Sequence, residues 1–312
     1  MEVIELYSYT AEEKFQIAKR HLVKKQLKAS GIKPAQLRIT DDALRLMIDG
    51  YTREAGVRKL ERTIAKTIRK EAVKIASGYD KKITVRASDL EELLGPRKFK
   101  PENLSGKDEV GVVNGLAWTR VGGTLLPIEV SSMDGTGKIE ITGNLGQVMS
   151  ESAKTAVSYV RSHADAFGID SSFYKNKDLH IHAPEGAVPK DGPSAGLAIT
   201  TAIVSELSGV PIKSHVAMTG EISLKGRAMA IGGLKEKSMA AYKAGCDTVI
   251  IPKENEKDLK EISDEVKENV SFICVESFEE VAEIALDRKP ESIQINHPLM
   301  NPGVKKVPAI AQ

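Results

Sequence analysis

Ser194 lies in the sequence GPSAG of residues 192–196, which matches the Gly-x-Ser-x-Gly pattern of many hydrolases. In that pattern the serine sits on a tight turn before a helix and attacks a carbonyl carbon as a nucleophile. A second interpretation is that Ser194 only caps the helix that follows it. The α/β-hydrolase form of the motif fits poorly, because Pro184, Pro189 and Pro193 interrupt the segment where a strand should lead straight into the turn.

A nucleophilic serine needs a base, and only His215 and His297 follow it in the order that an α/β-hydrolase triad requires. A lysine can serve instead when burial lowers its pKa towards neutrality. The helix expected over residues 234–244 has one face on which Lys237 is the one charge among Leu and Ala, while Lys235 points roughly the opposite way. We therefore take Lys237 as the candidate base. The alternative is that its long side chain reaches solvent.

No metal site is predicted. His180 and His182 share one face of an expected strand with Glu185 just beyond, a spacing compatible with zinc, but no further ligand is evident. Cys246 and Cys274 stand 28 positions apart without a Cys-x-x-Cys pair, so they support neither a cysteine-based zinc site nor a disulfide framework. We interpret Cys246 as a small core residue, and the cysteine content fits a reducing cytoplasm.

The sequence GTGK of residues 135–138 invites comparison with a P-loop but fails in three places. Ser132 stands where the motif has its first glycine, Ile139 stands where it has Ser or Thr, and the next segment is an expected strand rather than a helix. Residues 134–137 instead predict the turn of a β-hairpin. We expect that this chain alone hydrolyses no nucleotide.

Ser194 and Lys237 belong to a region, residues 105–288, that begins with short apolar runs and with runs in which apolar and polar residues alternate. Farther along this region, expected strands alternate with expected helices. Strands are expected at residues 110–113, 116–121, 124–130, 138–142, 178–182, 248–251 and 270–275, and helices at 145–167, 194–207, 234–244, 254–268 and 278–287. Strands that alternate with helices predict parallel pairs joined by crossovers. The predicted fold is mixed α/β, and residues 289–312 predict a disordered tail.

Residues 1–95 predict a small helical domain, followed by a linker over residues 96–104. Thr10 and Glu13 form a capping-box pattern for a helix that runs to about Ser30. Further helices are expected from about Thr40, over residues 57–75, where apolar residues recur every three or four positions, and over residues 88–94. A short strand is expected at residues 83–86.

Of the 312 residues, 41% are hydrophobic and 28% charged, which suffices for two domains with their own cores. No signal-peptide pattern and no run of about 18 apolar residues occurs, so we expect a soluble cytoplasmic protein. Residues 1–100 carry 23 Lys and Arg against 14 Asp and Glu. One interpretation is a nucleic-acid-binding module; the other, which the interleaved acids favour, is a solvated helical surface.

Several longer motifs in the same order resemble one known family. The sequences PKDGPSAG at 189–196, TGE at 219–221 and GGLKEK at 232–237 resemble the proteolytic domain of Lon, the ATP-dependent protease. The sequence YTREAGVRKLER at 51–62 resembles the small helical lid subdomain of the AAA+ ATPase module of Lon. The resemblance spans about residues 1–288. It implies a helical lid followed by a mixed α/β protease domain.

The resemblance assigns roles to five residues of this sequence. It implies that Ser194 is the nucleophile and Lys237 the general base, the same pair that the motif and the helix face select. It further implies that Thr219 hydrogen-bonds the lysine and that Asp191 is an acidic residue whose position differs between active and inactive sites. Arg58 matches the sensor-2 arginine, which reaches the nucleotide bound by the large ATPase subdomain.

The resemblance also implies an activity and partners. The activity is that of a serine endopeptidase that degrades unfolded or damaged proteins in protein quality control, and the assembly is a homohexamer. Weak DNA binding is a further expectation, which comes from the positive charge of residues 1–100. ATP and Mg would be needed by the full-length protein only, and no cofactor by the peptide-bond chemistry. Because the P-loop subdomain of the family has no counterpart in these residues, we expect this chain to be a fragment of a longer protein.

Overall fold

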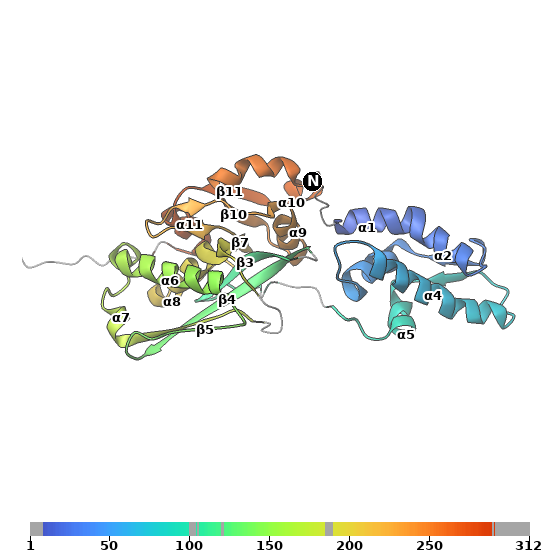
Figure 1. Cartoon of the computed structure of the whole chain (residues 1–312), viewed down its shortest axis with the longest axis horizontal. Helices are drawn as coiled ribbons and strands as arrows, with labels where there is room; N and C mark the ends of the chain where they lie inside the picture. The colour runs from blue at the N-terminus through green and yellow to red at the C-terminus, as the bar shows by residue number, and fades with distance from the viewer. Residues whose placement is uncertain are drawn as a thin grey trace, which may run out of the picture.

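A computed structural model describes residues 9–99, 104, 106–119, 122–184, 190–288 and 290 of the chain. Figure 1 shows a helical N-terminal unit beside a second unit built on a sheet. The buried core of the first unit runs from Phe15 to Leu93, and that of the second from Val113 to Leu286. The domain boundaries at residues 95 and 104 stay a prediction. Of the predicted tail, residues 289 and 291–312 lie outside the described residues, as do 100–103 of the predicted linker.

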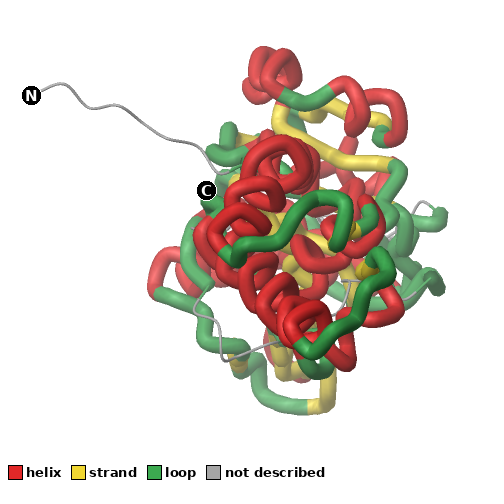
Figure 2. Tube along the Cα trace, turned by 90° about the vertical axis from the view of Figure 1, so that its right-hand side faces the viewer, coloured by secondary structure: helices red, strands yellow, loops and turns green. Residues whose placement is uncertain are grey.

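The N-terminal unit is helical as predicted, with one addition. Its helices are α1 (Ala11–Ile17), α2 (Val23–Ala29), α3 (Asp41–Leu46), α4 (Arg58–Ala76) and α5 (Leu90–Leu94), and π-helical turns continue α1 at Ala18–Leu22 and α3 at Met47–Tyr51. The addition is β1 (Leu37–Ile39), which pairs in parallel with the predicted strand β2 (Ile83–Val85). In Figure 2 this unit faces the reader and helices dominate it.

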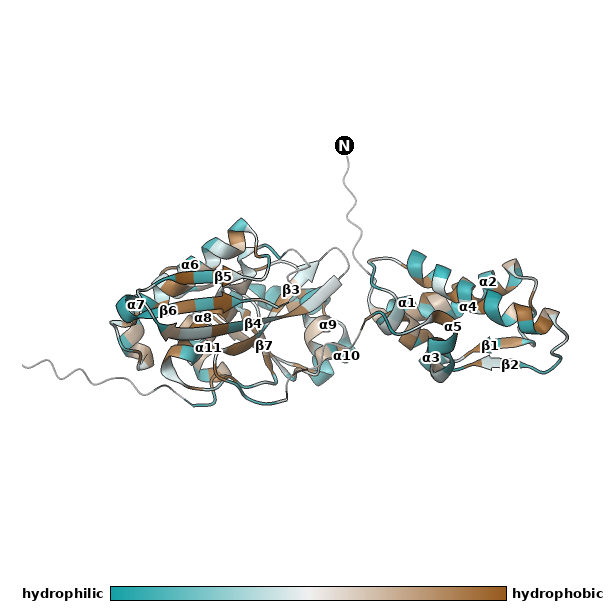
Figure 3. Cartoon of the chain, turned by 90° about the horizontal axis from the view of Figure 1, so that it is seen from below, coloured by the Kyte–Doolittle hydropathy of each residue, from teal (hydrophilic) through white to brown (hydrophobic). Residues whose placement is uncertain are grey.

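Helix α4 forms because its apolar residues fall on one face. Leu60, Ile64 and Ile68 are fully buried, while the basic residues between them face outwards, so the hydrophobic effect fixes the rotation of the helix. Figure 3 shows the same division, with hydrophobic residues on the inner faces of the N-terminal helices. Helix α4 ends before Gly78, whose φ of +95° suits a residue without a Cβ.

The second unit is built on a seven-stranded mixed sheet in the order β11-β10-β7-β3-β4-β6-β5. Its strands are β3 (Val112–Thr119), β4 (Gly122–Asp134), β5 (Ile139–Thr142), β6 (Lys177–His182), β7 (Val216–Met218), β10 (Thr248–Pro252) and β11 (Ser271–Val275). The parallel pairing predicted for the C-terminal third is confirmed, since β10 pairs in parallel with both β7 and β11. A separate two-stranded hairpin joins β8 (Glu221–Ile222) to β9 (Ala228–Met229).

The predicted hairpin around residues 134–137 is wrong. Strand β5 does not pair with β4 but runs parallel to β6, which lies between them in the sheet. The turn is anchored by Asp178 of β6, whose Oδ1 accepts hydrogen bonds from the backbone N–H groups of Thr136 and Lys138 at 2.7 Å each. The turn residues thus signalled a reversal of the chain but not the strand that would be inserted between its two arms.

Other predicted elements also differ from the structure. The strands expected at 110–113 and 116–121 are one strand, β3, and the helix expected at 254–268 is divided. A 3₁₀ segment covers Lys253–Glu261, and α10 (Asp264–Asn269) begins after Ser263, whose backbone is extended. The buried side chain of Ile262 lies at the break, so tertiary packing decides the course of the chain there.

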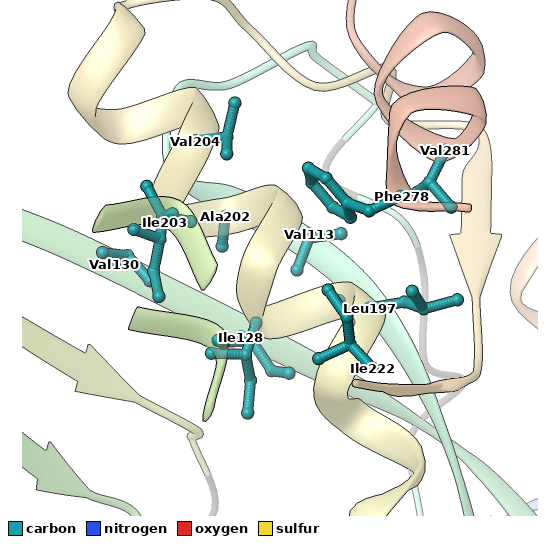
Figure 4. Packing of buried hydrophobic residues seen from close by; sticks show 14 of the residues in the cluster. Val113, Ile128, Val130, Leu197, Ala202, Ile203, Val204, Ile222, Phe278 and Val281 are labelled. Carbon is teal, nitrogen blue, oxygen red and sulfur yellow. The ribbon is translucent and has the colours of Figure 1, made fainter. Parts of the chain in front are cut away.

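Helices cover both faces of the sheet. Alternate residues of β10 show this: Ile250 belongs to the core shared with α6 (Gln147–Ser162), α8 (Gly196–Ser208) and α11 (Phe278–Ala285). Val249 and Ile251 belong instead to the core shared with α9 (Leu234–Ala244) and α10. Figure 4 shows side chains of α8 packed between those of β3 and β4 and those of α11. A short helix, α7 (Phe173–Asn176), precedes β6.

The two units meet at α9. The ammonium of Lys243 on α9 forms a salt bridge of 3.0 Å with the carboxylate of Asp49 in the N-terminal unit. Next to it lies a cavity of about 350 Å³ lined by residues of both units, including Lys14 and Lys235. No helix in the described part of the chain is long and apolar enough to span a membrane.

The capping box predicted at the start of α1 is confirmed. Thr10 Oγ1 accepts from the N–H of Glu13 at 3.2 Å, and the Glu13 carboxylate accepts from the N–H of Thr10 at 2.7 Å. We expect Thr10→Ala to lower the free energy of unfolding by about 1 kcal/mol, because one N–H of the first turn loses its acceptor. Urea unfolding followed by far-UV circular dichroism measures this. Thr10→Ser, which keeps the acceptor, is the control, and an equal loss in both variants contradicts the interpretation.

Candidate active site

Ser194 lies in the 3₁₀ turn Pro193–Ala195 that leads directly into α8. Its backbone carbonyl accepts hydrogen bonds from the N–H of Gly220 at 2.9 Å and from the hydroxyl of Thr219 at 3.3 Å. Within the described part of the chain, the Ser194 side chain makes no capping bond to the first turn of α8. The interpretation of Ser194 as a helix cap is therefore wrong, and its half-buried hydroxyl is available for other contacts.

Lys237 is buried on the inner face of α9. All five positions of the predicted face are buried, and only 2% of Lys237 is exposed, so the alternative in which its side chain reaches solvent is wrong. Burial lowers the pKa of its ammonium from 10.5 to about 8, because the charged form loses hydration. Among the residues that the structure describes, no carboxylate forms an ion pair with it to offset that loss.

Thr219 connects Lys237 to Ser194. This fully buried residue follows β7, and its own N–H donates to the carbonyl of Ile250 on β10 at 3.1 Å. Its hydroxyl accepts from Lys237 Nζ at 3.0 Å and donates to the carbonyl of Ser194. One hydroxyl therefore joins the amine of the candidate base to the backbone of the candidate nucleophile.

Asp191 lies three residues before Ser194, and its carboxylate faces α6. Its Oδ1 accepts from the N–H of Met149 at 3.1 Å, in the first turn of α6, and from the N–H of Gly192 at 3.0 Å. Gly146, at the start of α6, leaves room for it, because a Cβ there would lie 2.3 Å from the Asp191 carboxyl carbon. In this structure Asp191 therefore fastens the loop before Ser194 to α6, where negative charge is favoured by the helix dipole.

Arg58 is not part of this group. It begins α4 in the N-terminal unit, and its side chain is exposed. The N-terminus of α4 is capped by the carboxylate of Glu54, which accepts from the N–H groups of Lys59 and Leu60 at 2.8 Å each. The structure thus brings together Ser194, Lys237 and Thr219, and places Arg58 on a separate surface.

The remaining candidate side chains have other surroundings. His180 Nε2 and His182 Nδ1 lie 2.8 and 2.7 Å from the hydroxyl of Thr142, and Glu185 lies outside the described residues. In the described ranges, no three His, Cys, Asp or Glu side chains form a group that could hold a metal ion. Cys246 is buried, and burial raises the pKa of its thiol to about 12, which disfavours the nucleophilic thiolate.

Sequence reasoning missed one residue of this neighbourhood. Ser152 of α6 is buried, and its hydroxyl donates to the carbonyl of Pro193 at 3.3 Å. A serine inside a helical pattern carries no signal of a partner 41 residues away. Only the packing of α6 against the turn reveals the contact.

Comparison with known proteins identifies the family of this chain. Residues 84–288 match the family model of the Lon protease (S16) C-terminal proteolytic domain, and residues 28–84 match that of the Lon protease AAA+ ATPase lid domain. The chain is 51% identical to a Lon protease of Finegoldia magna over 286 residues, which is 92% of this chain and 37% of the relative. It is 52% identical to a Lon protease of Vibrio parahaemolyticus over 295 residues, which is 94% of this chain and 38% of the relative. The chain thus spans less than two-fifths of the length of these curated relatives.

Burial of Lys237 should make the stability of the fold depend on pH. Between about pH 8 and 10.5 the unfolded chain holds a proton at Lys237 that the folded chain has lost, so the free energy of unfolding should rise through this window. Below about pH 8 the full penalty, on the order of 3 kcal/mol, is present.

Lys237→Met removes this penalty, because it keeps an unbranched side chain without charge. We expect the variant to be more stable than the parent at pH 7 and to lose that advantage by about pH 10.5, as measured by urea unfolding at each pH. A difference between the two proteins that is constant from pH 7 to 10.5 contradicts the lowered pKa.

Proposed function

The chain belongs to the Lon protease family and carries its S16 proteolytic domain, and from this premise we propose that it cleaves peptide bonds with Ser194 as nucleophile and Lys237 as general base. The observation that carries the proposal is the buried amine of Lys237, which has no carboxylate partner among the described residues and is joined through Thr219 to the backbone of Ser194. A lysine in such surroundings is partly neutral near pH 8, as a base must be.

The proposed reaction is acyl transfer in two stages. Neutral Lys237 takes the proton of the Ser194 hydroxyl while the oxygen attacks the peptide carbonyl, and the protonated lysine then gives that proton to the leaving amine. The bond between carbonyl carbon and nitrogen breaks, and an acyl-enzyme ester forms. Water, deprotonated by Lys237, then attacks the ester, and the Ser194 oxygen leaves with the proton.

The negative charge that forms on the carbonyl oxygen needs hydrogen-bond donors. The first backbone N–H groups of a helix have no acceptor inside the helix, and Ser194 and Ala195 stand at the start of the 3₁₀ turn that continues as α8. We assign their N–H groups as the oxyanion donors. No metal takes part in this scheme, because the lysine supplies the proton transfer and the backbone supplies the electrostatic stabilisation.

For the longer protein we propose degradation of unfolded or damaged proteins by a homohexamer that uses ATP and Mg. The match to an AAA+ lid domain supports a nucleotide-dependent step, since lid domains belong to ATPase modules. Arg58 fits the role of a nucleotide sensor: its guanidinium is exposed and forms no salt bridge among the described residues, so it is available to a phosphate. ATP would supply the energy for unfolding and threading substrates, not for the bond cleavage.

The nucleic-acid-binding alternative gains no support from particular residues. Several basic side chains of the N-terminal unit are paired with acids, including Lys25 with Glu61 at 2.8 Å and Arg45 with Glu12 at 2.8 Å. This pairing favours the solvated helical surface. The cytoplasmic location remains a prediction, with which the free thiols of Cys246 and Cys274 agree.

The proposal predicts nucleotide-independent cleavage of an unstructured protein. Purified chain should digest a casein-like substrate slowly without ATP, and Ser194→Ala should reduce the rate by at least a thousandfold, because the nucleophile is gone. Gel electrophoresis of the substrate over time measures this. Digestion by Ser194→Ala at the parent's rate would exclude Ser194 as nucleophile.

The rate of peptide cleavage should depend on pH. The value of kcat/KM for a short peptide should rise about tenfold per pH unit below about pH 8 and level off above it, as Lys237 loses its proton. Lys237→Ala should abolish the activity, whereas Lys235→Ala, two positions away on the same helix and only half-buried, should keep most of it. A rate that is flat from pH 6 to 9, or equal losses in the two variants, contradicts lysine as the base.

A further inference from the structure

The two peptide groups that flank Ser194 are held by matching pairs of donors. The carbonyl of Ser194 accepts from one backbone N–H, that of Gly220, and from one hydroxyl, that of Thr219. The carbonyl of Pro193 likewise accepts from one backbone N–H, that of Gly196, and from the hydroxyl of Ser152. Each carbonyl is therefore fixed by two donors from different parts of the chain.

A peptide group is planar, with its C=O and N–H pointing in opposite directions. The carbonyl of Pro193 belongs to the same plane as the N–H of Ser194, and the carbonyl of Ser194 to the same plane as the N–H of Ala195. Holding each oxygen thus sets the direction of the N–H on its other side. These N–H groups are the two donors assigned above to the oxyanion.

Ser152 lies on the side of α6 that packs against the turn of Pro193–Ala195. It is only 8% exposed, and its hydroxyl has one recorded partner in the described chain, the carbonyl of Pro193. Gly196 eases the approach, since a Cβ at that position would lie 3.1 Å from Ser152 Oγ and 2.8 Å from the backbone nitrogen of Ile222. In this arrangement the buried hydroxyl of Ser152 and the carbonyl of Pro193 satisfy each other.

We propose that Ser152 is a positioning residue for catalysis, which sets the direction of the Ser194 N–H towards the oxyanion. The inference rests on the function proposed above. Thr219 contacts both the carbonyl of Ser194, which orients the Ala195 N–H, and the amine of Lys237. The Ser152 hydroxyl hydrogen-bonds only to the carbonyl of Pro193 among the described residues, so it acts on an oxyanion donor and not on the base. Removing the Ser152 hydroxyl should therefore weaken transition-state binding and leave the titration of the base unchanged.

Ser152→Ala tests this with a chromogenic peptide substrate. We expect kcat to fall about tenfold with KM within a factor of about two, because the donor is misdirected rather than absent and losing one donor entirely costs about 10²-fold or more. A peptide boronate, which forms a tetrahedral adduct with the serine, should bind about tenfold more weakly, while the midpoint of the pH profile of kcat/KM should not move.

Two controls accompany the variant. Ser158→Ala, on the same helix, removes an exposed hydroxyl whose one hydrogen bond within the described ranges is to the carbonyl of Lys154 at 2.8 Å, and it should change neither kcat nor boronate affinity. Ser152→Thr keeps the hydroxyl and should recover most of the lost kcat. Thermal unfolding of each variant shows that the fold is retained.

Unchanged kcat and boronate affinity in Ser152→Ala would overturn the inference, and so would a shifted pH midpoint, since that would place Ser152 on the side of Lys237. The outcome is distinct from a failure of the proposed function. If Ser194→Ala cleaves as fast as the parent, the dyad itself is wrong; if Ser194→Ala is inactive and Ser152→Ala is as fast as the parent, only the role of Ser152 is wrong.

Discussion

Desolvation of one amine is the interaction on which the site depends. Lys237 lies in the protein interior without a carboxylate partner in the described chain, and burial lowers its pKa to about 8. Had a carboxylate been placed beside it, the ammonium form would be favoured and the lysine would be a poor base near neutral pH. The small residues Ala241 and Ala244 on the same face let α9 pack closely against the sheet, which keeps water away from the amine. Burial of Lys237 therefore lowers the stability of the fold while it makes the lysine able to act as a base, and such a cost is common at functional sites.

A buried amine can act as a base only if its position is fixed. The sheet fixes the position of the Lys237 amine through Thr219. Strand β7 lies between β3 and β10, so the loop that follows it, with Thr219, starts from the centre of the sheet. The N–H of Thr219 is bonded to Ile250 of β10, and its hydroxyl is bonded to both Lys237 and Ser194. Elements far apart in the sequence therefore converge on a side chain whose backbone is hydrogen-bonded to the sheet.

The sequence predicted the local parts of this arrangement and missed the long-range ones. Ser194 and Lys237 could be selected because a turn before a helix and a single charge on an apolar helix face are visible within a dozen residues. The position of β5 could not, because the turn at 134–137 carries no information that β6 will be inserted beside β4. Ser152 was missed for the same reason, since its partner Pro193 is brought to it only by the packing of α6 against the turn before α8. The capping box at Thr10 was predictable because both of its residues lie within one helical turn.

Helix α9 belongs to the site and to the contact between the two units at once. Lys237 points from it into the protease core, and Lys243, six residues further along, is paired with Asp49 of the N-terminal unit. The two side chains lie on one helix of eleven residues, Leu234–Ala244, whose backbone hydrogen bonds join successive turns. One helix thus carries the proposed base on its buried side and, at its C-terminal end, a residue that contacts the unit matching an ATPase lid domain.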